Sequence, residues 1–266
     1  MEAAVGYSEA VQALLDSGRD YKLPHGGEGV LGLAYLYAGQ PKWAAEWCRA
    51  QLERGRDTHT LTRAFLVMSL TAAGSVDEAT AAANGLIEAA DATRNPYVLS
   101  NALFAYGYAF RETDPDRALH AFRRGMAIAQ DSGNRANESG LAVALASLET
   151  VHGDPLAALD YVAVAIRNFH DSGGAIQMAL TILSAVFDQL RRYEPAATIA
   201  GFAISPVTIT VLPELSATVA HLRDVLGDPT YESLAGKGET MTTAEMATYA
   251  YVQMDQARAE LNAVSE

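Results

Sequence analysis

The sequence predicts an all-α protein, a solenoid of about five helix–turn–helix units closed by a helical C-terminal cap. Alanine, the residue with the highest intrinsic helix propensity, supplies 50 of the 266 residues. A similar turn recurs every 35 to 40 residues, and apolar side chains at helical spacing flank it. Because a single helical hairpin cannot cover its own apolar faces, we expect successive units to stack.

The recurrent turns set the boundaries of the units. They open at Gly39, Gly74, Thr113, Gly153 and Tyr193. In the first four, an alanine follows five residues later, at Ala44, Ala79, Ala118 and Ala158. Proline after a turn suits the first turn of a helix, where its missing N–H costs no hydrogen bond. The predicted units span residues 26–55, 58–94, 96–132, 135–172 and 174–203, after a partial leading helix at 7–17.

The second helices of the third and fourth units repeat one apolar stripe. The members are Leu119, Phe122, Met126 and Ala129, and forty residues later Leu159, Val162, Ile166 and Phe169. This spacing marks one face of a helix. We expect the recurrent alanines to lie where the two helices of a unit cross, so that a larger side chain there would overpack the crossing.

The C-terminal part departs from the repeat. Residues 206–213 form the only β-branched run of the chain, bounded by two prolines. Strand is the local reading of this run, but no partner strand is predicted, so we expect an extended connector. Thr242 and Glu245 match a capping box at the start of a last helix, near residues 243–262. The predicted domains are therefore repeats at 1–204, a connector at 205–213 and a helical cap at 214–266.

Composition and charge exclude several classes of protein. The net charge is −13, which disfavours direct binding of nucleic acid, because that affinity depends on basic residues. Cys48 is the single cysteine, so neither an internal disulfide nor a thiolate metal cage is possible. No run of eighteen apolar residues and no secretory signal are seen, so we expect a cytoplasmic protein without membrane contact.

No motif in the sequence predicts catalysis, a cofactor or a metal. Residues 27–32 fit the letters of a dinucleotide fingerprint, but no strand precedes them as that chemistry requires. Gly238 stands where a phosphate-binding loop would need Ser or Thr. The six histidines lack metal-ligand spacing. Asp114, Asp154 and Asp228 precede prolines and are expected to be turn or cap residues. We therefore predict that the chain is not an enzyme.

Candidate binding residues lie on the first helices of the units, which line the concave face of a solenoid. Aromatic residues and arginine dominate the energetics of protein interfaces, which favours some of these positions as anchors. The alternative is that the aromatic side chains fill the interior. The predicted partner-binding residues are Tyr37, Met68, Asn101, Phe110, Arg111, Phe187 and Arg191; Leu33 and Ser147 share the same face.

The first unit resembles a tetratricopeptide repeat in residue type and spacing. The resemblance rests on Leu31-Gly32-x-x-Tyr35, then Gly39 and Ala44. Later units keep part of this pattern with a longer period, similar to the maltose-activator type of helical region in large actinobacterial regulators. Residues 222–250 resemble the closing segment of actinobacterial proteins that carry an ATPase module, either LuxR-type regulators or cyclase-linked ATPases.

This resemblance implies a non-catalytic interaction or sensor module of a signalling or transcriptional regulator. Its partner would be a protein or an attached domain of ATPase or cyclase type, bound on the concave face. Residues 214–266 hold three basic and nine acidic residues, which argues against a DNA-binding end. The alternative function is small-molecule sensing, in a pocket between the last repeat and the C-terminal helices.

Overall fold

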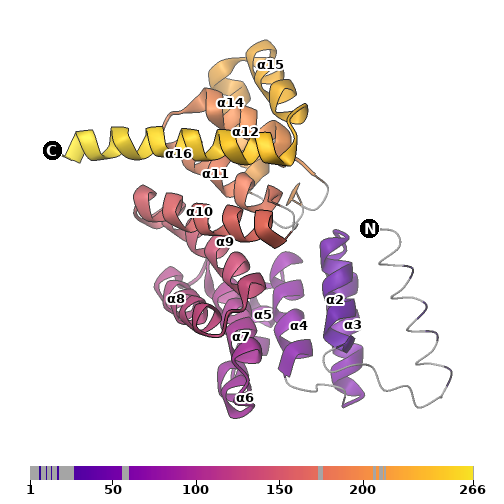
Figure 1. Cartoon of the computed structure of the whole chain (residues 1–266). Helices are drawn as coiled ribbons and strands as arrows, with labels where there is room; N and C mark the ends of the chain where they lie inside the picture. The colour runs from indigo at the N-terminus through magenta and orange to yellow at the C-terminus, as the bar shows by residue number, and fades with distance from the viewer. Residues whose placement is uncertain are drawn as a thin grey trace. The chain divides into compact units, whose positions relative to one another are not determined.

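The computed structural model describes an all-helical chain, as the sequence predicted. The described residues are 6, 10, 13, 17, 27–55, 60–172, 176–205, 208–209, 212 and 214–265, and no strand occurs among them. The chain divides into two compact units, residues 1–137 and 138–266 (Figure 1). The predicted leading helix lies almost entirely outside the described residues. So does most of the predicted connector, of which Thr208 and Ile209 have helical backbone.

The first unit consists of packed helical pairs. Helix α2 packs on α3, α4 on α5, and α7 on α8. The observed helices begin and end close to the predicted bounds. They are α2 Gly27–Tyr37, α3 Pro41–Glu53, α4 Leu61–Ala72, α5 Val76–Ala83, α6 Leu86–Ala92, α7 Pro96–Phe110 and α8 Pro115–Asp131, with the start of α9 Arg135–His152.

One helix expected from the sequence is broken in two. The second helix of the unit at 58–94 ends at Ala83 and resumes as α6 at Leu86. Gly85 has a φ of 71°, in the left-handed region that glycine adopts without a side-chain penalty. The guanidinium of Arg63 on α4 donates hydrogen bonds to the carbonyls of Ala82, at 3.0 Å, and of Asn84. Arg63 thereby satisfies carbonyl groups that the end of α5 leaves without a helical partner.

The helix starts follow from capping and proline. The carboxylate of Asp114 accepts a hydrogen bond from the backbone N–H of Arg117 at 3.1 Å, directly before Pro115. Asp154 likewise accepts from the backbone N–H of Leu156 at 2.8 Å. Both aspartates act as the caps that the sequence predicted, since a side-chain oxygen satisfies one of the free N–H groups of a first turn.

Small residues are buried on the paired helices. Ala44, Ala79, Ala118 and Ala158 are completely buried. A Cβ on Gly32 of α2 would lie 2.5 Å from the Sγ of Cys48 on α3. A Cβ on Gly107 of α7 would collide with the Phe122 ring on α8. The chain therefore uses alanine and glycine to bring the helices of a pair close together.

The second unit contains two repeat-like pairs and three further helices. Its helices are the rest of α9, α10 Pro155–Ser172, α11 Gln177–Gln189, α12 Tyr193–Ala203, α14 Glu214–Leu226, α15 Asp228–Glu239 and α16 Thr243–Ser265. Helix α12 packs against α11 on one side and also contacts α14 and α15. The predicted capping box is confirmed: Thr242 N–H donates to Glu245 at 2.8 Å, and Glu245 N–H donates to the Thr242 hydroxyl at 3.3 Å.

The crossing of α12 and α15 brings backbone against backbone. A Cβ on Gly201 would collide with the main chain of Ala235, and a Cβ on Gly238 would collide with the carbonyl of Thr198. Gly201 lies on α12 and Gly238 on α15. Each glycine leaves room for the backbone of the opposite helix. Gly238 is thus a packing residue within a helix, in agreement with the sequence argument against a phosphate-binding loop.

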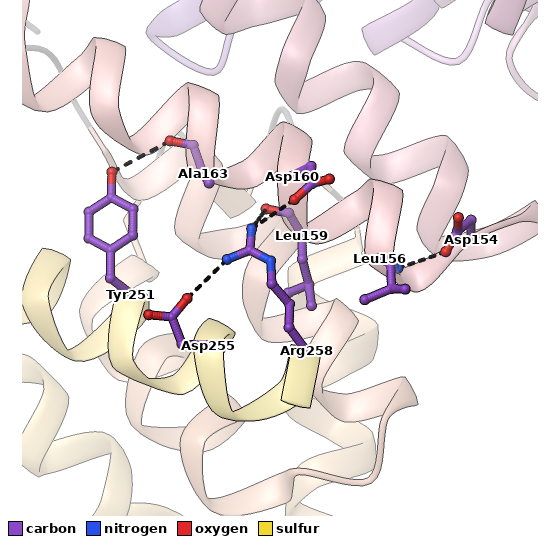
Figure 2. Close-up of polar contacts among 8 residues, drawn as sticks. All are labelled: Asp154, Leu156, Leu159, Asp160, Ala163, Tyr251, Asp255 and Arg258. Carbon is purple, nitrogen blue, oxygen red and sulfur yellow. Dashed lines mark hydrogen bonds and ion pairs between the residues drawn. The ribbon is translucent and has the colours of Figure 1, made fainter. Parts of the chain in front are cut away.

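Helix α16 is tied to α10 by polar contacts (Figure 2). Arg258 donates to the Asp160 carboxylate at 2.9 Å and pairs with Asp255 on its own helix at 3.2 Å. The Tyr251 hydroxyl reaches the carbonyl of Ala163 at 3.5 Å. Arg192, before α12, binds the middle of α16 through Gln253, at 2.9 Å. Two helices of the unit therefore hold α16 in place.

Candidate functional site: a cavity between α9, α11 and α14

The second unit contains a cavity of about 300 Å³. Three helices supply its walls: α9, α11 of the last repeat pair, and α14 of the C-terminal part. Its apolar surface includes Ile182, which is 1% exposed and lies deep, and Val151, which is 60% exposed. The described residues that line it are Ser147, Thr150, Val151, Ile182, Ala185, Asp188, Gln189, Ala217, Thr218 and His221.

An aspartate–histidine pair lies in this lining. Nδ1 of His221 on α14 lies 2.8 Å and 2.9 Å from the two carboxylate oxygens of Asp188, at the end of α11. The Asp188 side chain is 13% exposed and that of His221 is 51% exposed. A carboxylate accepts hydrogen bonds, so it selects the form of the imidazole that carries a proton on Nδ1. Nε2 of His221 is then the ring nitrogen left for a ligand.

Neighbouring groups fix the orientation of this pair. The Tyr193 ring meets the His221 ring edge to face, with the centroids 6.0 Å apart. Thr218, one turn before His221 on α14, is 5% exposed. Its hydroxyl makes no hydrogen bond in the part of the chain that the structure describes, so a polar group is available at the wall of the cavity.

Other ionisable groups of the second unit serve its packing. Tyr231 is 1% exposed, and burial raises the pKa of its hydroxyl, which has no hydrogen-bond partner among the described residues. The guanidinium of Arg223 lies 4.4 Å from the centre of the Tyr231 ring. Hydrogen bonds from Thr242 hold the pKa of Glu245 below its usual range. None of these three side chains lines the cavity.

Five predicted partner-binding residues lie in the first unit and differ in exposure. Tyr37, at the end of α2, is 46% exposed, and Met68 on α4 is half-buried. Asn101 on α7 is 8% exposed and donates from its amide to the carbonyl of Tyr97 at 3.0 Å. Tyr37 and Met68 therefore offer surface to a partner, whereas Asn101 serves its own helix.

Phe110 and Arg111 belong to a cluster of stacked aromatic and guanidinium groups. Phe110 is 9% exposed, and the guanidinium of Arg117 lies 3.8 Å from the centre of its ring. Arg111 lies 4.7 Å from the centre of the Tyr108 ring and keeps part of its side chain exposed. Phe110 is thus covered by the chain's own arginine, which fits the interior-filling alternative for this aromatic residue.

The two predicted residues of the second unit have opposite environments. Phe187 is completely buried on α11, and the Arg192 guanidinium lies 5.6 Å from its ring centre. This burial fits the interior-filling alternative and leaves Phe187 no surface for a partner. Arg191 is exposed and has a φ of 59°, two residues after the last residue of α11. Its backbone ends the helix in the left-handed conformation that usually favours glycine.

Sequence reasoning reached only part of the cavity. Ser147, placed on the inner face from the repeat register, lines it. Asp188 and His221 were not recognised as a pair. They are 33 residues apart, Asp188 on a repeat helix and His221 on a helix of the C-terminal part, so no local sequence spacing connects them. An aspartate at the end of a predicted first helix was the one available signal.

Metal binding and membrane insertion find no support in the described part of the chain. No three of its histidine, cysteine, aspartate or glutamate side chains are grouped as metal ligands would be. Within the same residues, every helix is too short or too polar to cross a bilayer. No model of a known protein family and no curated protein matches the chain.

Proposed function

We propose that the chain is a non-catalytic interaction and sensor module, built of tetratricopeptide-like repeats and working in the cytoplasm. The observation that supports this proposal is the succession of helices at the predicted positions, with zero exposure of the four alanines that the sequence predicts at the crossings. Stacked pairs of this kind create extended inner surfaces that bind partners. The resemblance adds a parent class, an actinobacterial signalling or transcriptional regulator with an attached ATPase or cyclase module.

The inner-face residues with free surface would carry partner binding. In the first unit these are Tyr37 and Met68, with Arg111 at the end of α7. Trp43 offers a matched control, because it is also an aromatic residue, is 64% exposed and lies on a second helix, α3. An aromatic anchor in the centre of an interface commonly contributes about 2 kcal/mol or more to binding.

The test compares captured proteins from cells that carry the parent gene. Wild-type chain, Tyr37→Ala and Trp43→Ala are used as bait, and the captured proteins are quantified by mass spectrometry. We expect Tyr37→Ala to lose a protein that wild type and Trp43→Ala both retain. Equal capture by all three would rule out the inner face of the first unit as the binding surface.

A second candidate function is small-molecule sensing in the cavity of the second unit. The cavity between α9, α11 and α14 favours it, because α11 belongs to the last repeat pair and α14 to the C-terminal helices. A ligand that binds one arrangement of these helices more tightly would shift the population of the module toward that arrangement.

Two exposed alanines of α14 provide the test. Ala217 lines the cavity and Ala220 does not, so Ala217→Phe would block the cavity while Ala220→Phe adds the same side chain elsewhere. A metabolite library is screened for compounds that raise the melting temperature. We expect hits whose effect disappears in Ala217→Phe and persists in Ala220→Phe. A library without such hits would contradict this function.

A further inference from the structure

We propose that the cavity binds a small, mostly apolar molecule that carries one hydrogen-bond donor, an amine or an alcohol, and discriminates against the corresponding carboxylate. The inference rests on the second function proposed above and specifies its ligand class. Four features of the unit support it: the size of the cavity, the tautomer of His221, the hydroxyl of Thr218 and the net charge.

Size and lining select a compact apolar body. A volume of about 300 Å³ lies at the lower end of the range for ligand pockets. Ile182 and Ala185 of α11 and Val151 of α9 supply aliphatic surface. Apart from the imidazole of His221, no aromatic side chain lines the cavity among the described residues, so stacking with a flat heteroaromatic ring contributes little there. A saturated ring or short branched chain fits this surface.

The polar groups of the lining favour a ligand that carries a hydrogen-bond donor. The Asp188 carboxylate lies within 2.9 Å of Nδ1 of His221 and so keeps a proton on that nitrogen. In the neutral imidazole, Nε2 is then a hydrogen-bond acceptor. Nε2 makes no hydrogen bond to any described residue. A ligand N–H or O–H would complete this arrangement.

Thr218 supplies an independent second observation. It is 5% exposed, lines the cavity and has no hydrogen-bond partner in the described ranges. Its hydroxyl oxygen is not among the buried polar atoms that lack a partner, so this oxygen remains accessible to a ligand that enters the cavity. A ligand hydroxyl or ammonium group can donate to Nε2 of His221 while it also meets the Thr218 oxygen.

Charge argues against an anionic ligand. The second unit, residues 138–266, has six basic and sixteen acidic residues, a net charge of −10. Among the described residues, no lysine or arginine lines the cavity, and the carboxylate in the lining is that of Asp188. The field of such a unit attracts cations and repels anions before any contact forms. A carboxylate ligand would be repelled by this charge, and it has no proton to donate to the acceptor Nε2 of His221.

The experiment uses three probes with the same ring: cyclohexylamine, cyclohexanol and cyclohexanecarboxylate. Their binding to the full chain is measured by calorimetry at pH 8. We expect the amine and the alcohol to bind at least ten-fold more tightly than the carboxylate. His221→Phe should weaken both by ten-fold or more, and His120→Phe, an exposed histidine of α8, should leave both unchanged.

Thr218→Val covers the case in which His221→Phe does not fold, because it only changes one unpaired hydroxyl to a methyl group. It should weaken the binding of the amine and of the alcohol by three-fold or more. Carboxylate binding that equals or exceeds that of the other probes overturns the ligand class, as does unchanged binding in both variants. If none of the three probes binds but the library hits still lose their effect in Ala217→Phe, the proposed ligand class is wrong and the sensing function is retained. Absence of any such hit overturns both.

Discussion

Replacing Gly238 with alanine adds one methyl group at the crossing of α12 and α15. The new Cβ would collide with the carbonyl oxygen of Thr198 and lie 3.0 Å from its carbonyl carbon and 3.2 Å from the nitrogen of Phe202. All three are backbone atoms, so no side chain can rotate away. Helix α15 must move from α12 and give up close packing along the crossing.

The magnitude follows from two opposing effects. Alanine in place of glycine in a helix interior is worth about 0.5–1 kcal/mol of stability through its helix propensity. Overpacking a well-packed contact costs typically about 1–3 kcal/mol, and a collision with rigid backbone belongs at the upper end. Gly238→Ala should therefore destabilise the protein by about 2 kcal/mol.

Gly236 is the matched control, two residues earlier on the same helix. An alanine Cβ there meets nothing within 4 Å, so Gly236→Ala should gain the propensity term, about 0.5–1 kcal/mol. Urea unfolding followed by circular dichroism measures both variants against wild type. We expect a difference of about 3 kcal/mol between them. Equal stabilisation of the two variants would refute the close α12–α15 crossing.

Three further predictions concern stability. Ala118→Leu should cost about 1–3 kcal/mol, because Ala118 is completely buried at the α7–α8 crossing; unchanged urea unfolding would contradict that placement. Tyr231→Phe should be neutral or stabilising by up to about 1 kcal/mol, since it removes a buried hydroxyl without a partner; a clear loss would mean that the hydroxyl is bonded. The depressed pKa of Glu245 adds stability above the unfolded pKa of about 4.3, which is lost as pH falls through the native pKa. The melting-temperature gap between wild type and Glu245→Gln should therefore be largest above pH 5 and close near pH 3; a constant gap would exclude this linkage.

Local signals predicted most of the helices. Apolar spacing, proline after a turn and an aspartate before it act within a few residues, so they can be read directly from the chain. The starts of α8 and α10, capped by Asp114 and Asp154, were found in this way. The break between α5 and α6 also had a local signal, the pair Asn84-Gly85, which is typical of a turn.

Contacts between distant segments escaped the same reasoning. The pairing of Asp188 with His221 depends on how α14 lies across α11, and that angle is set by packing rather than by spacing. The complete burial of Phe187 has the same origin, since an aromatic residue on an inner helix face has the same sequence pattern whether it is covered or open. Side-chain roles at a helix crossing require the tertiary structure.

The attachment of α16 has a mechanical consequence. A domain joined to the C-terminus of this chain would pull on α16 from its far end, so its contacts would be loaded in order along the helix. Arg192 with Glu260 and Arg258 with Asp160 would yield first, the Gln256 and Gln253 contacts of Arg192 next, then Tyr251 with Ala163, and the Thr242–Glu245 cap last. Because contacts with α10 and with Arg192 alternate along α16, tension from an attached domain would release the helix from both in small steps rather than in a single event.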